Sequence, residues 1–439
     1  MATGTPKTKG NNQQKASCLY YPNKKPVAEI LDYPPPKLVK VGKTTPANNK
    51  LIFADNLGAL SALAQDKSVK GKVRLIYIDP PFATQSVFHS RKLIHAYEDT
   101  LGGTDFIEFL RERLIFLHQL LADNGSLYLH LDERMVFHFR IILDEIFGSG
   151  KYRNCITRKK CNPKNYTHKT YGNVADYVLF YTKSDSYVWN RPHEKWTDER
   201  AAKEYQCVEP ASGKRFKKVP IHAPGARRGE TGKPWRGMLP PPGKHWQYTP
   251  AKLDELDARG EIYWSSTGNP RRKVYFDDSL GVPLQDIWMD VSDAHNQNIK
   301  ITGYPTEKNP ELVRRIILAS SNPGDLVVDC FSGSGTTLAV AAELGRCWIG
   351  VDNSKEAIHA TLKRFATGLE PMGDYIIKKD EYLQSNTLPL FGEKAGGYVD
   401  EHIPIKNYSL YAEDVHIKEA QTILGKFDQV PNGICVEAV

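Results

Sequence analysis

Two kinds of apolar segment alternate along most of the chain from residue 50 onward. The first kind is short and almost continuously apolar, as in "LIFADN" and "VRLIYIDPP", which is typical of strands covered on both faces. The second kind repeats every three to four residues, as in 104–122, where Thr104 is placed to cap a predicted helix. Strands that alternate with amphipathic helices predict an α/β fold with a doubly wound, mostly parallel sheet.

The alternation is interrupted once, and this divides the fold into two halves. In the first half, "NGSLYLHLD" predicts a turn at Asn124–Gly125 and then a strand, and "ERMVFHFRIILDEIFG" predicts a helix. The pattern resumes near residue 300 with "NPELVRRIILASS", "DLVVDCF", "TTLAVAAELG" and "CWIGVD". The intervening stretch is rich in Pro, Gly, Trp, Lys and Arg, which is typical of an inserted recognition module. The predicted domains are a flexible basic leader (1–47), one half of the sheet domain (48–185), the insertion (186–285), the second half (286–366) and a C-terminal appendage (367–439).

Positive charge is concentrated in two of these segments. The chain has a formal net charge of +8. Residues 1–50 contain nine Lys and two acidic residues, and residues 191–275 contain 18 Lys or Arg and ten acidic residues. Two basic blocks on a mildly acidic body indicate a polyanionic partner, although a solvated surface with a basic tail would give the same composition.

Cysteine usage and hydropathy narrow the class of protein. The seven Cys are scattered and form no CxxC pair, so we expect neither a zinc site nor a disulfide framework, and no metal. The first ten residues, "MATGTPKTKG", contain no apolar core of a signal peptide. No apolar run approaches the ~18 residues that a membrane span requires. We therefore expect a cytoplasmic protein that does not enter a membrane.

A glycine loop follows the strand "DLVVDCF". Gly333 and Gly335 form a G-x-G turn that allows a ligand to approach the backbone closely. A dinucleotide-binding loop would have a third glycine at the position of Leu338, so a pyrophosphate site is disfavoured. Asp352 ends the next predicted strand, where an acid can bind ribose hydroxyls. The pattern favours a nucleoside cofactor without a pyrophosphate, such as S-adenosylmethionine, over a simple strand–helix turn.

The strand "VRLIYI" ends in Asp79-Pro80-Pro81-Phe82. An exocyclic amine of a nucleobase is a poor nucleophile, and two acceptors that hold its two hydrogens would direct its lone pair outward. Asp79 offers one acceptor, and the carbonyl of Pro80, fixed by Pro81, offers the other. Phe82 can stack on the base, which has to leave the duplex to reach such a pocket. A strand-terminating turn with an incidental acid is the alternative, which the glycine loop disfavours.

Together these motifs resemble the amino-methyltransferases of DNA, which methylate adenine N6 or cytosine N4. "DPPF" resembles their catalytic motif, "DCFSGSGTT" their cofactor loop, and "GYPTEKNPELVRRIILASSNPGD" the segment before that loop. The catalytic motif comes first here and the cofactor loop last, which is similar to the circularly permuted beta class with a target recognition domain between the halves. The resemblance covers residues 48–366 and implies a Rossmann-like methyltransferase sheet.

The resemblance implies S-adenosylmethionine as cofactor and assigns residues by their matching positions. Asp79, Pro80, Pro81 and Phe82 match the base clamp. The residues that match or extend the cofactor site are Asp55, Asn56, Thr306, Lys308, Phe331, Ser332, Gly333, Gly335, Thr336 and Asp352. Within that set, Thr306 and Lys308 resemble the binding site for the methionine end. Asp at position 79 favours adenine, whereas adenine enzymes more often have Tyr at position 82, so cytosine N4 stays open.

The expected partner is double-stranded DNA in a prokaryotic or phage setting, where the enzyme would be associated with the nucleoid. A homodimer and a separate restriction or defence subunit stay open, as do the methylation of RNA or of a protein amide and a binding protein that retains only the fold. The long basic insertion argues for nucleic acid.

One further expectation concerns the order of strands in the sheet. The chain leaves the recognisable domain one helix after Asp352, so the strand next to that of Asp352 has to come from elsewhere. We expect "LIFADN" to supply it, with residues 51–55 parallel to the cofactor half. Asp55 would then lie at the carboxyl edge and accept a hydrogen bond from the adenine of the cofactor. Capping of the following helix is the alternative role for Asp55 or Asn56.

Overall fold

The computed structural model describes residues 18–42, 48–81, 87–89, 95–98, 103–163, 169–194, 196–277, 279–293, 300–301, 307–371 and 404–427. The chain divides into two compact units. The large unit contains the described residues of 18–192, 285–371 and 404–427, and the small unit contains those of 193–284. The small unit lies in the sequence between the two parts of the large unit, at 193–284 where an insertion at 186–285 was predicted.

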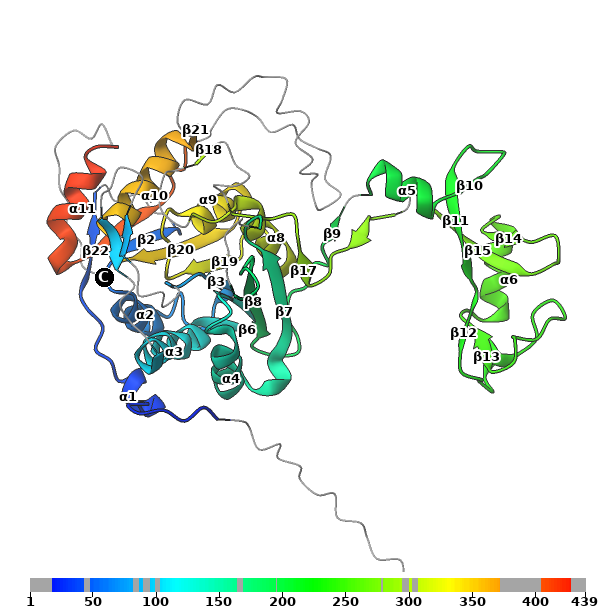
Figure 1. The fold of residues 1–439 in the computed structure, drawn as a ribbon, viewed down its shortest axis with the longest axis horizontal. Helices are drawn as coiled ribbons and strands as arrows, with labels where there is room; N and C mark the ends of the chain where they lie inside the picture. The colour runs from blue at the N-terminus through cyan, green and yellow to red at the C-terminus, as the bar shows by residue number, and fades with distance from the viewer. Residues whose placement is uncertain are drawn as a thin grey trace, which may run out of the picture. The chain divides into compact units, whose positions relative to one another are not determined.

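A ten-stranded sheet forms the centre of the large unit (Figure 1). Its strands in spatial order are β1 (Leu38–Val41), β22 (Ser409–Glu413), β2 (Lys50–Phe53), β20 (Cys347–Asp352), β19 (Leu326–Asp329), β3 (Val73–Ile78), β6 (Leu121–Leu131), β8 (Ala175–Thr182), β7 (Tyr152–Lys159) and β17 (Ile287–Trp288). The six neighbours from β22 to β6 are parallel, and β1 and β8 run against them. The predicted mostly parallel α/β sheet is confirmed.

Helices cover both faces of this sheet. They are α2 (Asn56–Gln65), α3 (Gly103–Leu120) and α4 (Val136–Phe147) on one face, and α8 (Pro310–Ser320), α9 (Thr336–Glu343) and α10 (Lys355–Thr367) on the other (Figure 1). Short polar side chains begin three of them: Asp55, Asn309 and Ser354 each accept hydrogen bonds from backbone N–H groups of the first helical turn. Gly148, at φ 88°, ends α4 in a conformation that favours glycine.

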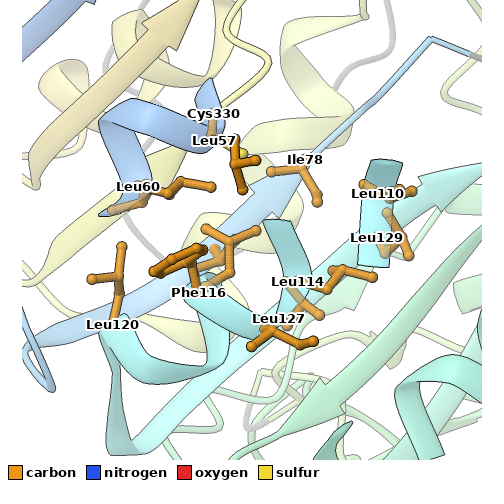
Figure 2. Packing of buried hydrophobic residues seen from close by; sticks show 14 of the residues in the cluster. Leu57, Leu60, Ile78, Leu110, Leu114, Phe116, Leu120, Leu127, Leu129 and Cys330 are labelled. Atoms are coloured by element: carbon orange, nitrogen blue, oxygen red, sulfur yellow. The ribbon is translucent and has the colours of Figure 1, made fainter. Parts of the chain in front are cut away.

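The apolar core lies between the sheet and the first group of helices (Figure 2). Leu60, Ile78, Leu114 and Leu129 are fully buried there. Each such side chain contributes roughly 1.5–3 kcal/mol through its burial. This core fixes the end of β3, and therefore the position of the residue that follows Ile78, against α2 and α3.

Strand β6 begins earlier than the sequence predicted. The dipeptide Asn124–Gly125 lies inside the strand and forms no turn. The pairing with β3 is irregular at that point, because Val73 pairs with Leu121 whereas Leu75 pairs with Ser126. The extra residues form a bulge that the pattern of the sequence does not distinguish from a turn.

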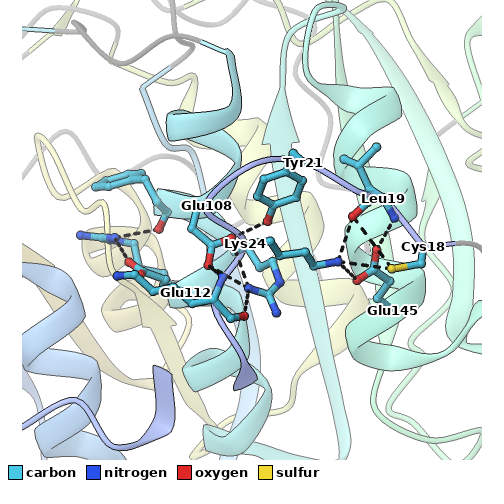
Figure 3. Close-up of polar contacts among 11 residues, drawn as sticks. Cys18, Leu19, Tyr21, Lys24, Glu108, Glu112 and Glu145 are labelled. Carbon is cyan, nitrogen blue, oxygen red and sulfur yellow. Dashed lines mark hydrogen bonds and ion pairs between the residues drawn. The ribbon is translucent and has the colours of Figure 1, made fainter. Parts of the chain in front are cut away.

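Part of the predicted flexible leader is built into the large unit, so that prediction is wrong for residues 18–42. This segment contains α1 (Val27–Leu31) and β1. Its polar side chains bind two helices (Figure 3): the Tyr21 hydroxyl donates to Glu108 on α3, and Lys24 Nζ lies 2.6 Å from Glu145 on α4. The basic, proline-rich composition of residues 18–42 therefore does not indicate disorder, because this segment forms a helix and a strand that contact the rest of the large unit.

The C-terminal segment also joins the sheet. Strand β22 pairs in parallel with β2 and antiparallel with β1, and α11 (Ile417–Leu424) packs beside them. The sequence predicted only an appendage for this region. Four further short strands occur in the large unit, and they pair as β4 (Val87–His89) with β5 (His95–Glu98) and as β18 (Lys300–Ile301) with β21 (Glu370–Pro371).

The small unit is built from short antiparallel strands around a tryptophan core. Its elements are β9 (His193–Glu194), α5 (Asp198–Glu204), β10 (Cys207–Val208), β11 (Arg215–Pro220), β12 (His222–Pro224), β13 (Lys244–Trp246), α6 (Pro250–Ala258), β14 (Ile262–Trp264), β15 (Pro270–Tyr275) and β16 (Val282–Pro283). Four of them form a sheet in the order β10-β11-β15-β14. Trp235 and Trp246 are 1% and 3% exposed and pack with Leu253, Leu256 and Trp264 in the core of this unit.

Candidate active site and cofactor loop

The predicted site residues follow strands that end at one edge of the sheet. Because β2, β20, β19, β3 and β6 are parallel, their carboxyl ends lie together, which is where open α/β sheets bind ligands. Asp55, the glycine loop and Asp79 follow β2, β19 and β3 respectively, and Asp352 is the last residue of β20. The pairing of β2 with β20 places Phe53 opposite Asp352, and the predicted parallel pairing is confirmed.

Asp79 is held between two basic side chains. Lys308 Nζ lies 3.0 Å from Asp79 Oδ2, and His130 Nδ1 lies 3.7 Å from Asp79 Oδ1. Oδ1 is buried and makes no hydrogen bond within the described residues. Pro80 is buried and Pro81 is half-buried, which fixes the turn after β3, whereas Phe82 lies outside the described residues. An amine that binds Asp79 would compete with Lys308 for Oδ2.

His130 connects Asp79 to a second buried carboxylate that the sequence did not predict. His130 is fully buried on β6, its Nε2 lies 3.0 Å from Asp176 Oδ2 on β8, and its Nδ1 lies 2.9 Å from the Tyr77 hydroxyl. Burial alone would raise the pKa of Asp176, but His130 and Arg158 outweigh it and hold this pKa well below its usual range. The "LHLD" stretch, with a histidine at the end of a buried strand, was the available signal.

Arg158 is the next member of this group of charges and contacts Asp176. It is fully buried on β7, its Nε lies 3.3 Å from Asp176 Oδ1, and it forms an ion pair with Asp293. A buried guanidinium between two carboxylates offsets charges that would otherwise be costly to desolvate.

The glycine loop joins β19 to α9. Gly333 and Gly335 have φ angles of 49° and 72°. A Cβ on Gly335 would lie 2.8 Å from Thr361 Oγ1, which itself donates to the Gly333 carbonyl at 3.0 Å. Leu338, in place of a third glycine, packs against Gly350, where an added Cβ would lie 2.3 Å from Leu338 Cδ1. The close helix–strand contact therefore depends on a glycine in β20, and α9 begins at Thr336.

Asp352 fixes the loop from the neighbouring strand. Its Oδ2 accepts a hydrogen bond from Gly333 N at 2.8 Å, and its Oδ1 accepts one from Ser354 N at 2.9 Å. Burial raises the pKa of Asp352 to about 6, although both hydrogen bonds favour the ionised form. Ser332 is 5% exposed, and its backbone N–H donates to the Val351 carbonyl at 3.1 Å.

Asp329 braces the same loop and was not among the predicted site residues. It accepts hydrogen bonds from Phe331 N at 3.0 Å and from Thr337 Oγ1 at 2.6 Å. Burial, with the negative charges of Asp79 and Asp352, raises the pKa of Asp329 to about 7. Its position at the end of β19, two residues before Phe331, would have identified it as a loop anchor.

Asp55 and Asn56 are both engaged in contacts within the protein. Asp55 Oδ1 accepts from Leu57 N at 2.9 Å, so the capping role is confirmed, while its Oδ2 lies 3.4 Å from Arg113 Nη2. The Asn56 amide donates to the Cys330 carbonyl at 2.9 Å and accepts from Arg113 Nε. Asn56 thereby ties α2 to the strand before the glycine loop. The Asp55 side chain is 48% exposed, and its contact with a cofactor stays a prediction.

Glu307, the residue before Lys308, is connected to the glycine loop through Arg364. Glu307 and Arg364 form a buried ion pair, and Arg364 Nη2 also lies 3.3 Å from Ser334 Oγ. Thr306 lies outside the described residues. The expected role of Lys308 at the methionine end stays a prediction, whereas its contact with Asp79 is shown.

The described residues contain no cluster of three or more His, Cys, Asp or Glu that could hold a metal ion. A search of the same residues finds no helix that is long and apolar enough to span a membrane.

Comparisons with known proteins identify the family. A family model described as "DNA methylase" matches residues 73–363. The chain is 49% identical over 365 residues to the type II methyltransferase M.EcaI of Enterobacter cloacae, a match that covers 82% of this chain and 79% of the relative. The type III StyLTI Mod subunit of Salmonella typhimurium is 25% identical over 327 residues, which is 66% of this chain and 49% of that relative.

Among solved structures, the M1.HpyAVI–SAM complex matches with a TM-score of 0.40 and 18% identity, covering 72% of this chain and 98% of that one. The PvuII DNA methyltransferase, described as cytosine-N4-specific, matches with a TM-score of 0.40 and 15% identity over 75% of this chain and 88% of that one. The chain belongs to the DNA methylases, in the N6/N4 amino-methyltransferase family, and its motifs follow the permuted order of the beta class.

Proposed function

We propose that the chain is a site-specific DNA methyltransferase that transfers a methyl group from S-adenosylmethionine to the N6 amine of an adenine flipped out of double-stranded DNA. The observation that carries this proposal is the position of Asp79 at the end of β3, directly beside β19 and its glycine loop. A target amine and a methyl donor have to meet in one place, and adjacent strand ends provide it.

The proposed chemistry depends on positioning. Asp79 and the Pro80 carbonyl accept the two hydrogens of the amine and direct its lone pair outward. Holding two reactants in line replaces a bimolecular encounter, an effect that can contribute roughly 7–11 kcal/mol to lowering a barrier. Asp79 has to exchange Lys308, which lies 3.0 Å from its Oδ2, for the amine.

The residues of the loop fit a nucleoside cofactor. Gly335 packs so closely against Thr361 that a Cβ would clash, which keeps the backbone of the loop in its φ 72° turn, and the half-buried Asp352 carboxylate can accept hydrogen bonds from ribose hydroxyls. Phe331, Ser332, Gly333 and Thr336 form the rest of this loop. S-adenosylmethionine bound there supplies an electrophilic methyl group.

Asp55 is the proposed acceptor for the adenine amino group of the cofactor. The confirmed pairing of β2 with β20 and the partial exposure of its carboxylate support this assignment. Asp55→Ala removes the cap of α2 as well, which costs about 1 kcal/mol. Asp55→Ser retains a capping hydroxyl, so both variants should weaken cofactor binding, measured by calorimetry, whereas loss of the cap alone would weaken it only in Asp55→Ala. Unchanged affinity in Asp55→Ala would contradict the assignment.

Adenine is the proposed target because position 79 is Asp, whereas many cytosine-N4 enzymes are expected to have Ser there. Cytosine N4 is the alternative product. The small unit is the proposed DNA-recognition module, and its exposed Arg227, Arg228 and Arg271 are candidate phosphate or base contacts.

The test is methyl transfer from labelled S-adenosylmethionine to DNA, RNA and protein in parallel, followed by long-read sequencing of DNA from an expressing host. The proposal predicts N6-methyladenine at one recognition sequence. N4-methylcytosine would establish the alternative base, and label only in RNA or protein would overturn the proposed substrate.

A further inference from the structure

The environment of His130 is organised around its two ring nitrogens. Its strand β6 lies next to β3 in parallel register, with Ile78 opposite Leu129, so His130 is opposite the residue that follows β3. On the other side, β8 pairs Val178 with His130 and Tyr177 with Leu131. Asp176 is the residue next to Tyr177, two positions from Val178. The imidazole is thereby placed between two carboxylates, those of Asp79 and Asp176.

The contacts of each nitrogen define which one carries the proton. Nε2 lies 3.0 Å from Asp176 Oδ2, an ion-pair distance without the geometry of a hydrogen bond, and because a carboxylate can only accept, we assign the proton of the neutral ring to Nε2. Nδ1 is then the acceptor in the neutral ring, and the Tyr77 hydroxyl at 2.9 Å can donate to it. Nδ1 also lies 3.7 Å from Asp79 Oδ1. This is the logic of a histidine whose tautomer is set by a buried acid.

The ion-paired groups around His130 carry a net negative charge that one added proton would neutralise. Among the residues that the structure describes, the charged and titratable groups that face it directly or through one neighbour include Tyr77 on β3, Asp79, Asp176 on β8, Arg158 on β7, Asp293, Lys308 and Asp329 on β19. The ion-paired members are three carboxylates and two cations, which sum to one negative charge. Uptake of one proton by His130 would therefore neutralise the summed charge of these ion-paired groups.

We propose that His130 is a positioning residue that takes up, through Asp79, the proton that the target amine loses on methylation. This inference rests on the proposed function. The amine nitrogen forms a bond to the methyl carbon while the carbon–sulfur bond of the donor breaks, and that electron pair stays on sulfur. The nitrogen then keeps the electron pair of one N–H bond, and the proton passes to Asp79 and on to His130 Nδ1. The 3.7 Å gap closes when substrate is bound, as catalytic hydrogen bonds commonly do.

The test compares His130→Gln with wild type in single-turnover methyl transfer between pH 5 and pH 8. Neutral His130 is the acceptor, so the wild-type rate should fall toward low pH. His130→Gln should lower the rate about 10²-fold near neutral pH and flatten the low-pH limb. The affinities for S-adenosylmethionine and DNA should stay within about twofold of wild type, since Gln touches neither by this proposal.

The matched control is His118→Gln. His118 is half-buried on α3 against Phe147, and burial with the nearby Lys183 lowers its pKa to about 4, so it is neutral across most of the assay range. The control should retain both rate and profile. A flat wild-type profile, a wild-type rate in His130→Gln, or an equal loss at every pH would overturn the proposal, since the last is what a purely structural role gives.

A second measurement does not depend on activity, and its first part uses only the wild-type protein. In [¹⁵N]histidine-labelled wild-type protein near pH 8, the His130 ring should show the tautomer protonated at Nε2. Asp176→Asn replaces a carboxylate that can only accept by an amide that can also donate to Nε2, and this should shift the ring toward the other tautomer. A proton on Nδ1 in the wild type would overturn the proposal. Absence of any methyl transfer by wild type would instead refute the proposed function.

Discussion

The large and small units use the same charged residue types in opposite ways. In the large unit Arg158, Asp176 and Asp329 are 0%, 1% and 3% exposed; Arg158 and Asp176 pair with other charges, and Asp329 accepts hydrogen bonds from Phe331 N and Thr337 Oγ1. In the small unit, cations lie over partly exposed rings, as with Lys218 Nζ, 3.7 Å from the Tyr263 ring centroid. Electrostatic interactions strengthen with burial, whereas exposed charges stay available to a partner. Chemistry is therefore expected of the first arrangement and binding of the second.

The cores of the two units differ in the same sense. The large unit has a continuous aliphatic core in which no single side chain dominates. The small core depends on a few tryptophans, and their indole N–H groups are satisfied by acids at the rim: Trp235 donates to Asp254 and Trp264 to Asp257, both at 2.8 Å. The small unit should consequently be the more sensitive of the two to one large-to-small change.

The largest expected effect concerns Asp79, in the unit to which we assign the chemistry. Asp79→Ala removes the acceptor for the target amine, so methyl transfer should fall by roughly 10³-fold or more, a loss of the size seen when a key transition-state contact is removed. Cofactor affinity and the thermal unfolding midpoint should change little. Asp185→Asn, whose side chain is 73% exposed, is the control. Near-full activity of Asp79→Ala would remove Asp79 from the site.

The core of the small unit provides the second test. Trp235→Ala should destabilise the small unit by about 3–5 kcal/mol, because it empties the centre of its core. DNA affinity should fall strongly, whereas S-adenosylmethionine binding by the large unit should persist. Leu239→Ala, at a side chain that is 69% exposed, should affect neither. Loss of cofactor binding together with DNA binding would show that the two units do not act separately.

The surface charge of the small unit is the third test. Replacing Arg227, Arg228 and Arg271 by Gln should weaken DNA binding and reduce the slope of log affinity against log salt by about 0.9 for each phosphate that is no longer bound. The matched control removes three exposed lysines, Lys67, Lys70 and Lys72, before β3 at the amino end of the strands. Equal effects of both triple variants would mean that net charge alone matters, and no effect of the arginine variant would place the DNA elsewhere.

The smallest expected effect is a pH dependence of cofactor binding. Because burial raises the pKa of Asp352 to about 6, the carboxylate that should accept the ribose hydroxyls is lost as the pH falls through 6. Affinity measured by calorimetry should be constant above that pH and drop by up to about tenfold per unit below it. Asp352→Asn should bind more weakly and without this dependence.

Protonation of Asp352 does not destabilise the folded protein, so this group cannot cause a loss of cofactor affinity at low pH through unfolding. A carboxyl group with a raised pKa binds protons more readily in the folded protein than in the unfolded chain, so its contribution to stability increases as the pH falls from about 6 toward 4. A wild-type affinity that stays constant down to pH 5 would show that Asp352 does not bind the cofactor in its ionised form.

The sequence alone predicted the site residues wherever a buried strand is followed by residue types that have few other uses. The glycine loop, Asp352 and the "DPPF" turn combine a buried strand with residue types of narrow use, and the connection of β2 to β20 followed from counting strands. Other long-range contacts were not accessible from the sequence. Nothing in "SLYAE" indicates that β22 joins β2, and the contacts of Tyr21 and Lys24 come from helices more than 80 residues away.

His130 shows a different limit. The "LHLD" stretch marks His130 at the end of a buried strand but does not indicate its partner, because Asp176 lies on β8, whose antiparallel position follows from the chain's path after α4. Asp329 was not predicted although it immediately precedes "CFSGSG", because the spacing of the glycines does not indicate which residue anchors them.

The pairing of β2 with β20 has a consequence for the time course of synthesis. Phe53 and its partner Asp352 are separated by nearly the whole of both halves and by the small unit. At 5–20 residues per second, β2 leaves the ribosome about 15–60 s before the strand that covers one of its edges. Leu51, Ile52 and Phe53, each 1% exposed or less in the finished protein, have no sheet partner during that interval. The nascent chain should therefore be a client of chaperones that hold apolar segments, and the helix α2 that follows β2 is the nearest local element able to shield it.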